Sequence, residues 1–347
     1  MLMADMGAEI IKIEDPNVPD YTRFMPPHLN GVGVNYLALN RNKKSITLNL
    51  KTEKGLQQFY DLVKEADIVV DSFRPGVLAK MKLDYETVKQ YNPKIIYVAV
   101  TGYGQDGPYK NMAGHDINYL AYAGVLGING TPDKIMKPGI QIADIAGGTY
   151  PTIIACLAAL WHRDRTGEGQ IVDVAMTDCV LPFLSFYLTE TLNSSKTYQR
   201  GEHPLAGSLV NYNIYKCKDE KWIALGSLEP KFWINFCTAI QKPEWTSKMM
   251  DEQVKNELKT LFLTQTRDEW ITQTINADCC IAPIYELDEI EQDPYHIARN
   301  NFVEVEHPSL GKIKMINQPI KFSAIKDQQE FSAPPEMGEH NKQYNIE

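Results

Sequence analysis

The chain has 347 residues, enough for about two domains that each bury a core. Hydrophobic residues make up 44% and charged residues 23%, ordinary proportions for a globular protein, so a disordered chain and a mini-protein are excluded. With 35 Lys and Arg against 44 Asp and Glu, the net charge of −9 provides no global field that could hold nucleic acid. An anionic ligand must therefore be held by a local group of cations.

At its start, the chain has the pattern of the last turns of a helix, which Gly7 ends, followed by a β-branched strand over residues 9–13. Helices in α/β folds normally follow a strand. We therefore expect a first strand and the front of this helix to be missing, which leaves one edge of the fold incomplete.

Strand and helix patterns then alternate as far as residue 104. Strands are predicted over residues 45–50, 67–71 and 94–100, and helices over residues 53–66 and after Pro75. This β-α-β-α-β order predicts an α/β fold with a doubly wound, parallel, Rossmann-like sheet.

Further helices are predicted over residues 116–126, 144–161 and 176–192, with a strand over residues 169–175. From about residue 198, two alternating strands and several amphipathic helices predict a smaller α+β domain. The expected division is a large domain over residues 1–200, a small domain over residues 201–318 and a C-terminal segment, 319–347, that returns to the large domain.

The cysteines and the apolar runs bear on where the protein works. Six cysteines form no CxxC motif, and Cys279 and Cys280 are adjacent, which argues against a disulfide framework or a zinc site. The longest apolar run, 153–161, is about half of what a bilayer requires, and no secretory signal pattern opens the chain. We expect a cytoplasmic protein that does not span a membrane.

Three short segments place an ionisable side chain where a loop meets a predicted helix. These side chains are His115 with Asp116, then Asp144, and then Glu229. The first N–H groups of a helix can bind developing negative charge there. An Asp at a helix start is most often only a cap, and a lone His is most often structural. Spacing alone therefore leaves catalysis and capping both open.

A set of motifs in order along the chain makes the sequence recognisable. They are MLMADMGAEIIKIE, LNRNKKSITLNLK, DSFRPGV, GHDINYLAYAGVLG, ADIAGG, TGEGQIVDVAMTD, GSLEPKFW and, at residues 333–340, APPEMGEH. Together they closely resemble the α-methylacyl-CoA racemases of the class III CoA-transferase (CaiB/BaiF) family over essentially the whole chain. The chain departs from that pattern at its start, where family members carry a strand and a Gly-Pro-rich turn.

This resemblance implies a fold, an assembly and a ligand. It implies a Rossmann-like large domain, a small domain on long linkers, and a homodimer of interlocked chains with active sites between the large domain of one subunit and the small domain of the other. It further implies an acyl-CoA substrate, with no separate cofactor and no metal. Neither nucleic acid nor a membrane is expected as a partner.

The implied reaction is racemisation of 2-methylacyl-CoA thioesters by two-base proton transfer through an enolate. His115 matches the family's base on one face of the substrate, and Asp144 matches the base on the other. Glu229 matches the acidic residue that orients the histidine. We expect the backbone N–H of Asp116 to bind the enolate oxygen, and its side chain to act as a cap rather than a base.

The phosphates of CoA require local positive charge in a net-acidic protein. Arg41 and Lys43, with Lys44, lie in the motif LNRNKK, and Arg74 lies in FRPG. Both arginines match family motifs, whereas solvated surface charge stays open for the two lysines. Tyr103, between Gly102 and Gly104, is expected to line the thioester or pantetheine channel.

Two rival functions remain. A CoA transferase on the same fold would use Asp144 as a nucleophile that forms an aspartyl-CoA thioester. That mechanism needs only the carboxylate, whereas racemisation also needs the opposed base His115. A non-catalytic CoA-binding protein is the second rival, and the presence of His115, Asp144 and Glu229 argues against it.

Overall fold

The structure is a computed structural model that describes residues 1–249, 251–324 and 330–346. The chain divides into two compact units. The first unit comprises Met1–Thr101, Tyr150–Val174 and Ile290–Glu347, and the second comprises Gly102–Thr149 and Ala175–Glu289. This division differs from the contiguous one expected from sequence, because residues 102–149 join the second unit and the return to the first begins at Ile290 rather than at 319.

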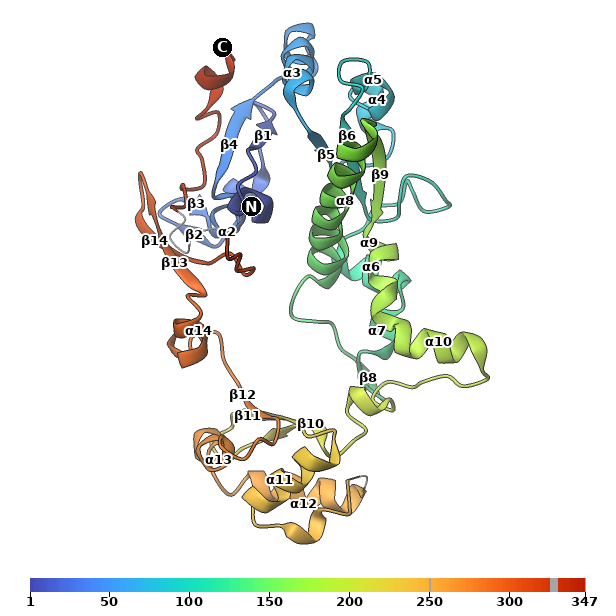
Figure 1. The fold of residues 1–347 in the computed structure, drawn as a ribbon, viewed down its shortest axis with the longest axis vertical. Helices are drawn as coiled ribbons and strands as arrows, with labels where there is room; N and C mark the ends of the chain where they lie inside the picture. Colours follow the sequence, from blue (N-terminus) through green and yellow to red (C-terminus); the bar gives the residue numbers. More distant parts are fainter. Residues whose placement is uncertain (250, 325–329, 347) are drawn as a thin grey trace. The chain divides into compact units, whose positions relative to one another are not determined.

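The first unit holds the parallel strands and the helices that connect them (Figure 1). Its strands are β1 Ile10–Glu14, β2 His28–Leu29, β3 Val32–Gly33, β4 Lys43–Thr47, β5 Ile68–Asp71, β6 Ile96–Thr101, β9 Gln170–Ala175, β13 Phe302–His307 and β14 Gly311–Ile316. Its α-helices are α1 Leu2–Asp5, α2 Val34–Asn40, α3 Glu53–Glu65, α4 Val77–Lys80, α5 Tyr85–Val88, α8 Tyr150–Thr166 and α14 Pro294–Ala298. Its 3-10 turns are η1 Tyr21–Arg23, η6 Ile290–Gln292 and η7 Asn341–Tyr344.

The parallel sheet of the first unit occurs in two pieces. β1 pairs in parallel with β4, Ile10 opposite Lys43, while β5 pairs in parallel with β6, Ile68 opposite Ile96, in a sheet of order β5-β6-β9. One hydrophobic cluster joins strands of both pieces to α3, with Ile46 from β4 fully buried. The predicted α/β class with a parallel sheet is confirmed.

Local sequence explains why α3 begins where it does. Thr52 stands at its N-cap and its hydroxyl accepts a hydrogen bond from the N–H of Gly55, 3.1 Å away. The helix then buries Phe59, Tyr60 and Val63 on one face. A capped start and a single apolar face are what an amphipathic helix on a sheet requires.

The C-terminal segment packs along β4. The N–H of His340 donates to the backbone oxygen of Ser45 at 3.0 Å, and the side-chain oxygen of Asn341 accepts from the N–H of Thr47 at 2.9 Å. Ile346 is buried in the cluster of the first unit. The return of this segment to the first unit agrees with the expectation for the end of the chain.

The second unit contains short helices and an antiparallel sheet. Its α-helices are α6 Asp116–Tyr122, α7 Val125–Ile128, α9 Met176–Val180, α10 Ser185–Asn193, α11 Pro230–Ala239, α12 Glu252–Phe262 and α13 Arg267–Thr274. Its strands are β7 Gly130–Thr131, β8 Lys134–Ile135, β10 Tyr212–Lys216, β11 Trp222–Gly226 and β12 Ile281–Ile284. Its remaining turns are the π-helix η2 Ala143–Thr149 and the 3-10 turns η3 Leu181–Leu184, η4 Pro204–Ala206 and η5 Pro243–Trp245.

Aromatic residues form the main core of the second unit. The antiparallel sheet has the order β10-β11-β12, and helices α11, α12 and α13 contribute Trp233, Phe262 and Trp270 to one buried cluster beside it. The indole N–H of Trp270 donates to the backbone oxygen of Phe262 at 3.0 Å. The antiparallel sheet and the helices α11, α12 and α13 therefore share one buried core.

Three predicted helices are interrupted. Gly124, at a φ of +85°, separates α6 from α7 inside the helix expected over residues 116–126. Pro182 lies in the 3-10 turn between α9 and α10, inside the helix expected over residues 176–192. The helix expected over residues 144–161 begins as a π-helical turn before it becomes α8. A left-handed glycine and a proline each end a run of α-helical hydrogen bonds.

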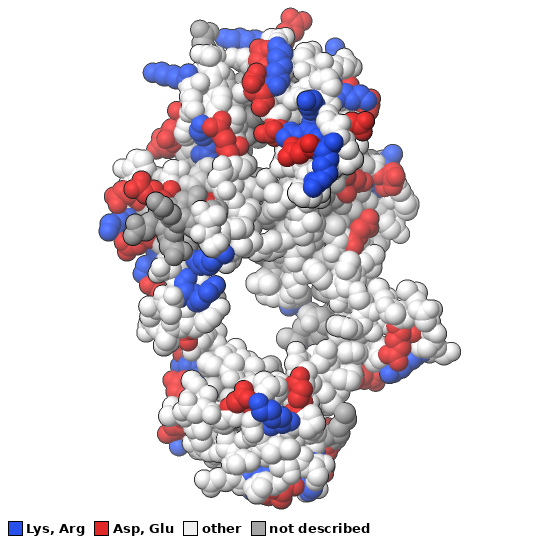
Figure 2. Space-filling view, in the orientation of Figure 1, with Lys and Arg blue, Asp and Glu red and all other residues white. Residues whose placement is uncertain are grey.

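Positive and negative side chains are interspersed on the face shown in Figure 2. This distribution agrees with the absence of a global field inferred from composition. In the described part of the chain, one helical run, Ala143–Thr166, is long and apolar enough to cross a membrane by length and composition. A core helix of a soluble protein passes the same test, so this is weak support for a membrane span.

Candidate functional site

His115 stands at the N-cap of α6, at the end of a glycine-containing loop. Its backbone N–H donates to the side-chain oxygen of Asn118 at 3.0 Å, and its backbone oxygen accepts from the N–H of Asn118 at 2.8 Å. These two bonds fix the backbone of His115 at the start of the helix, and its side chain is exposed.

A cluster of tyrosines fixes the loop before His115. Tyr119 Oη donates to the backbone oxygen of Gly114 at 2.6 Å, and its ring meets that of Tyr103 edge to face at 5.2 Å. A Cβ at Gly114 would lie 2.6 Å from Tyr119 Cε1, and one at Gly102 would lie 2.2 Å from it. Only glycine fits at these two positions, so the tyrosine rings determine the path of the loop.

Tyr103 itself lies inside this cluster. Its ring also packs against Tyr109 and Tyr122, and among the described residues its buried hydroxyl has no hydrogen-bond partner. Burial raises the pKa of Tyr103, with a smaller contribution from Tyr122. Its assignment to a thioester or pantetheine channel stays a prediction.

Asp144 lies in the π-helical turn η2, which packs closely against α9. A Cβ at Gly147 would lie 2.7 Å from Val180 Cγ1 and 2.8 Å from the backbone oxygen of Met176. The widened turn thus depends on a residue without a side chain at its contact with α9. Single π-helical turns of this kind occur often at functional sites.

Asp116 connects the two helix starts. Its Oδ1 accepts hydrogen bonds from the backbone N–H of Ala143 at 2.6 Å and from that of Asp144 at 3.1 Å. The side chain of the residue after His115 therefore caps the turn that carries Asp144. This agrees with the expected capping role, although the helix that Asp116 caps is a different one from its own.

The charges around Asp144 act on its proton affinity. Partial desolvation, followed by the negative charge of Asp116, raises the pKa of Asp144, whereas His115 lowers it. The charges of Asp116 and His115 thus lie near enough to act on the Asp144 carboxyl. A carboxylate with a raised pKa is a stronger base, which suits proton abstraction.

Glu229 is exposed at the N-cap of α11. Its charge raises the pKa of Cys280 after desolvation, which places it beside that thiol. Within the described residues, it forms no hydrogen bond or ion pair with His115. Its expected role as the group that orients the histidine stays a prediction.

Arg41 is placed differently from a surface cation. Its side chain is fully buried, and its Nε and Nη2 donate to the two carboxylate oxygens of Asp5 at 3.2 and 2.8 Å. Its Nη1 donates to the backbone oxygen of Ile316, and the ring of Phe331 covers its guanidinium at 4.4 Å. Binding of a CoA phosphate by Arg41 would require this ion pair to open.

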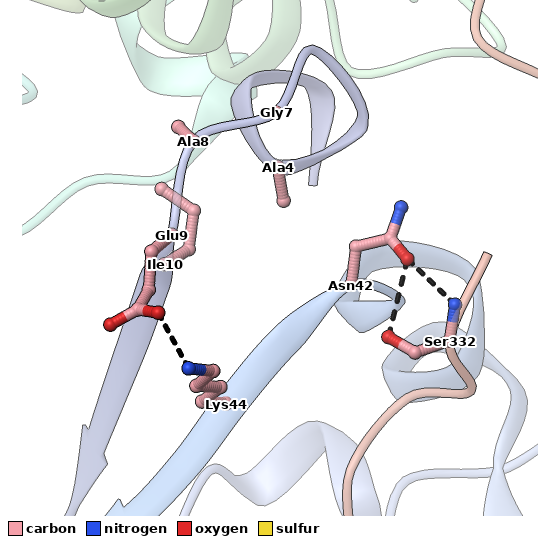
Figure 3. Close-up of a pocket in the computed structure, with 8 residues that line it drawn as sticks. All are labelled: Ala4, Gly7, Ala8, Glu9, Ile10, Asn42, Lys44 and Ser332. Atoms are coloured by element: carbon pink, nitrogen blue, oxygen red, sulfur yellow. Dashed lines mark hydrogen bonds and ion pairs between the residues drawn. The ribbon is translucent and has the colours of Figure 1, made fainter. Parts of the chain in front are cut away.

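The neighbouring lysines also have protein partners. Lys43 donates to the side-chain oxygen of Asn40 at 2.9 Å, and burial, followed by the charge of Lys12, lowers the pKa of Lys43 to about 8. Lys44 forms an ion pair with Glu9 at the edge of a pocket of about 310 Å³, as Figure 3 shows. The side chain of Asn42 also lines this pocket, and its oxygen accepts a hydrogen bond from the N–H of Ser332 at 2.7 Å.

Arg74, in contrast, is exposed in the loop after β5. Directly before this loop, the carboxylate of Asp71 accepts a hydrogen bond from the N–H of Phe73 at 2.7 Å. Among the four expected cations, Arg74 is the one whose side chain is freely accessible in this structure.

The structure thus brings His115, Asp116 and Asp144 together and leaves Glu229 apart from them. In the part of the chain that the structure describes, no group of three or more His, Cys, Asp or Glu side chains could hold a metal ion. Sequence analysis assigned no role to Tyr119 or to Asp71. Tyr119 stands in a recognised motif, but a motif does not reveal which backbone oxygen its hydroxyl contacts.

The amino-acid sequence is similar to that of CoA-transferases and of a racemase that acts on CoA thioesters. The model of CoA-transferase family III matches residues 1–341. Human succinyl-CoA:glutarate CoA-transferase is 31% identical over 98% of this chain and 80% of its own length, and human alpha-methylacyl-CoA racemase is 30% identical over 99% and 87%.

A solved structure agrees with these relatives. The crystal structure of a CAIB/BAIF family protein from Brucella suis matches with a TM-score of 0.85 and 28% identity, over 99% of this chain and 93% of that one. The match extends through both units, which include the loop of His115 and the turn of Asp144. The chain therefore belongs to CoA-transferase family III.

Proposed function

We propose that the protein racemises 2-methylacyl-CoA thioesters. The observation that supports this most directly is the pairing of His115 with Asp144, two ionisable groups of different kinds that lie near one another and are exposed to solvent. A racemase needs a base on each face of the α-carbon, and each base must also return a proton.

The proposed reaction balances in two steps. One base removes the α-proton, and the electron pair moves onto the thioester oxygen to form an enolate. The conjugate acid of the other base then delivers a proton to the opposite face. The backbone N–H of Asp116, in the first turn of α6, has no intrahelical acceptor and is our candidate donor to the enolate oxygen.

The surroundings of the two bases suit an apolar acyl group. Ile117 follows Asp116, Ile145 follows Asp144, and both side chains are nearly half exposed. Apolar side chains at the edge of a reaction centre favour a hydrocarbon substituent over a second carboxylate.

A CoA transferase is the second candidate. The similarity to human succinyl-CoA:glutarate CoA-transferase, at 31% identity, favours it. In that reaction Asp144 attacks the thioester carbonyl and CoA leaves, and CoA thiolate then attacks the resulting anhydride to give an aspartyl-CoA thioester and a free acid. His115 has no required part in these steps.

The test is incubation with (R)- and (S)-2-methylacyl-CoA in heavy water. We expect deuterium at the α-carbon together with loss of chirality from either enantiomer. In His115→Ala, exchange from one enantiomer should fall by about 10²-fold or more relative to the other, because one face loses its base. Equal small losses for both enantiomers would refute the two-base assignment.

A covalent adduct would decide for the transferase. In that case, mass spectrometry after incubation with an acyl-CoA and an acceptor acid would find CoA attached to Asp144. The wild-type protein would then transfer CoA without exchanging the α-proton, and His115→Ala would transfer as fast as wild type.

A further inference from the structure

The loop that carries Arg74 is held at both of its ends by one tyrosine hydroxyl. β5 ends at Asp71, and the chain returns to the core at Leu83 after the loop and α4. Tyr97 Oη, on β6, lies 3.1 Å from Asp71 Oδ2 and 3.1 Å from the backbone oxygen of Leu83. The hydroxyl therefore contacts both ends of the segment between Asp71 and Leu83, which includes Arg74.

The second oxygen of Asp71 shapes the loop itself. Asp71 Oδ1 accepts from the N–H of Phe73 at 2.7 Å, which forms a turn one residue before Arg74. Asp71 and Tyr97 are 9% and 3% exposed. A buried carboxyl is costly unless it is hydrogen-bonded, and here both of its oxygens have partners. The hydrogen bonds of Asp71 at the end of β5 thus hold the start of the loop that carries Arg74.

We propose that Asp71 and Tyr97 are positioning residues for CoA binding. They fix the backbone of residues 72–76, so that the exposed Arg74 side chain starts from a defined place. This inference rests on the proposed function, a reaction of an acyl-CoA, and on the expectation from sequence that Arg74 binds a phosphate group of CoA. A loop ordered before binding loses less conformational entropy when the phosphate arrives.

Tyr60 provides a matched control. Its side chain is buried to a similar degree, at 7% exposed, and its hydroxyl donates to the backbone oxygen of Lys82 at 2.8 Å, next to Leu83. Among its described contacts, none involves Asp71. Tyr60→Phe therefore removes one hydrogen bond near Leu83, at the C-terminal end of this segment, and leaves the turn at Asp71 intact.

The experiment is calorimetric titration of the full chain with CoA. Arg74→Ala should weaken binding by about tenfold or more, since it removes a charge-assisted hydrogen bond. Tyr97→Phe and Asp71→Ala should weaken it by about three- to tenfold, and should cause no further loss when combined with Arg74→Ala. Tyr60→Phe should bind CoA as wild type does.

The conservative variant Asp71→Asn should restore most of the affinity that Asp71→Ala loses. Its side-chain oxygen can accept from Phe73, while its NH₂ group donates to Tyr97. In an acyl-CoA assay, Tyr97→Phe should raise KM more than it lowers kcat.

The outcomes separate the two proposals. If Arg74→Ala binds CoA as wild type does, the expected phosphate contact of Arg74 fails and the positioning proposal fails with it, whereas the proposed racemisation is tested separately by the exchange assay. If Arg74→Ala weakens binding but Tyr97→Phe and Asp71→Ala both bind CoA as Tyr60→Phe and wild type do, the positioning role is refuted. It is also refuted if the loss in Tyr97→Phe adds in full to the loss in Arg74→Ala. Should Asp71→Ala not fold, the Tyr97→Phe titration and its combination with Arg74→Ala decide alone.

Discussion

Asp116 links the two candidate bases at the scale of single hydrogen bonds. It follows His115 directly, and its carboxylate accepts from the N–H groups of Ala143 and Asp144. Its charge also raises the pKa of Asp144. One carboxylate thus sets both the position and the proton affinity of a base, and a suitable substitution separates the two effects.

Asp116→Asn should move the acidic limb of the kcat/KM profile to lower pH. The amide oxygen can still accept both backbone hydrogen bonds, but the negative charge that raises the pKa of Asp144 is lost. Asp144 then stays ionised at lower pH, and its activity as a base persists there. The measurement is racemisation rate against pH for the variant and the wild type.

Asp106→Asn serves as the control for this profile. Asp106 is exposed and is not among the groups that act on the pKa of Asp144. Its variant should show the wild-type limb. An unchanged limb in Asp116→Asn, or an equal shift in Asp106→Asn, would contradict the coupling.

At the scale of elements, the π-helical turn η2 is the feature that presents Asp144. It meets α9 at Gly147, where the structure has no room for a Cβ. Gly147→Ala should therefore shift the turn and lower racemase activity by at least tenfold, and overpacking should cost about 1–3 kcal/mol of unfolding free energy. Activity assays and chemical denaturation measure the two effects.

Gly127→Ala is the matched comparison. Gly127 lies in α7, and a Cβ there would meet no atom within 4 Å. Alanine in a helix is favoured over glycine by about 1 kcal/mol, so this variant should be at least as stable as wild type and fully active. Wild-type activity and stability in Gly147→Ala would show that η2 tolerates a side chain, and equal losses in both variants would show that the effect is not specific to the contact at Gly147.

Most elements could be predicted because their patterns are local. The strands ending at Asp71 and Thr101 follow continuous apolar runs, and the structure confirms them. The π-helical turn could not be predicted, since its cause is a close contact between Gly147 and α9 that comes later in the chain. The hairpin β13-β14 was missed, although the residues from Phe302 alternate and Gly311 follows a turn.

At the scale of the whole molecule, the two units draw on segments far apart in the sequence. Residues 102–149 belong with the second unit, although a strand of the first unit leads directly into them. The sequence pattern changes near residue 198, but this change does not show which segments pack together. The resemblance predicts which residues to consider for the site, and those roles stay predictions, whereas the hydrogen bond from the N–H of Asp144 to Asp116 needed the fold.

The homodimer that the family resemblance implies yields a prediction about shared sites. If each site takes His115 from one chain and Glu229 from its partner, His115→Ala and Glu229→Gln chains that assemble together form one intact site. Co-expressed heterodimers isolated with two different tags should then regain about half of the wild-type activity per dimer. Each variant purified alone should be strongly impaired.

The control for this experiment is co-expression of His115→Ala with Asp144→Asn. Because both residues lie in one segment of the second unit, Gly102–Thr149, one chain supplies both to the same site, and this pair should recover no intact site. If His115→Ala with Glu229→Gln recovers no more activity than the control pair, His115 and Glu229 do not come from different chains.

The two pieces of the parallel sheet have a consequence for the protein in solution. In the described part of the chain, β1 pairs on one side only, with β4, and β5 on one side only, with β6. The opposite edges present backbone N–H and C=O groups that extended segments of other chains can bind. Amide hydrogens on these edges should exchange with solvent faster than those of β6, which is paired on both sides. These two edges are therefore the places in the described sheets where an extended segment of a second molecule could add at high protein concentration.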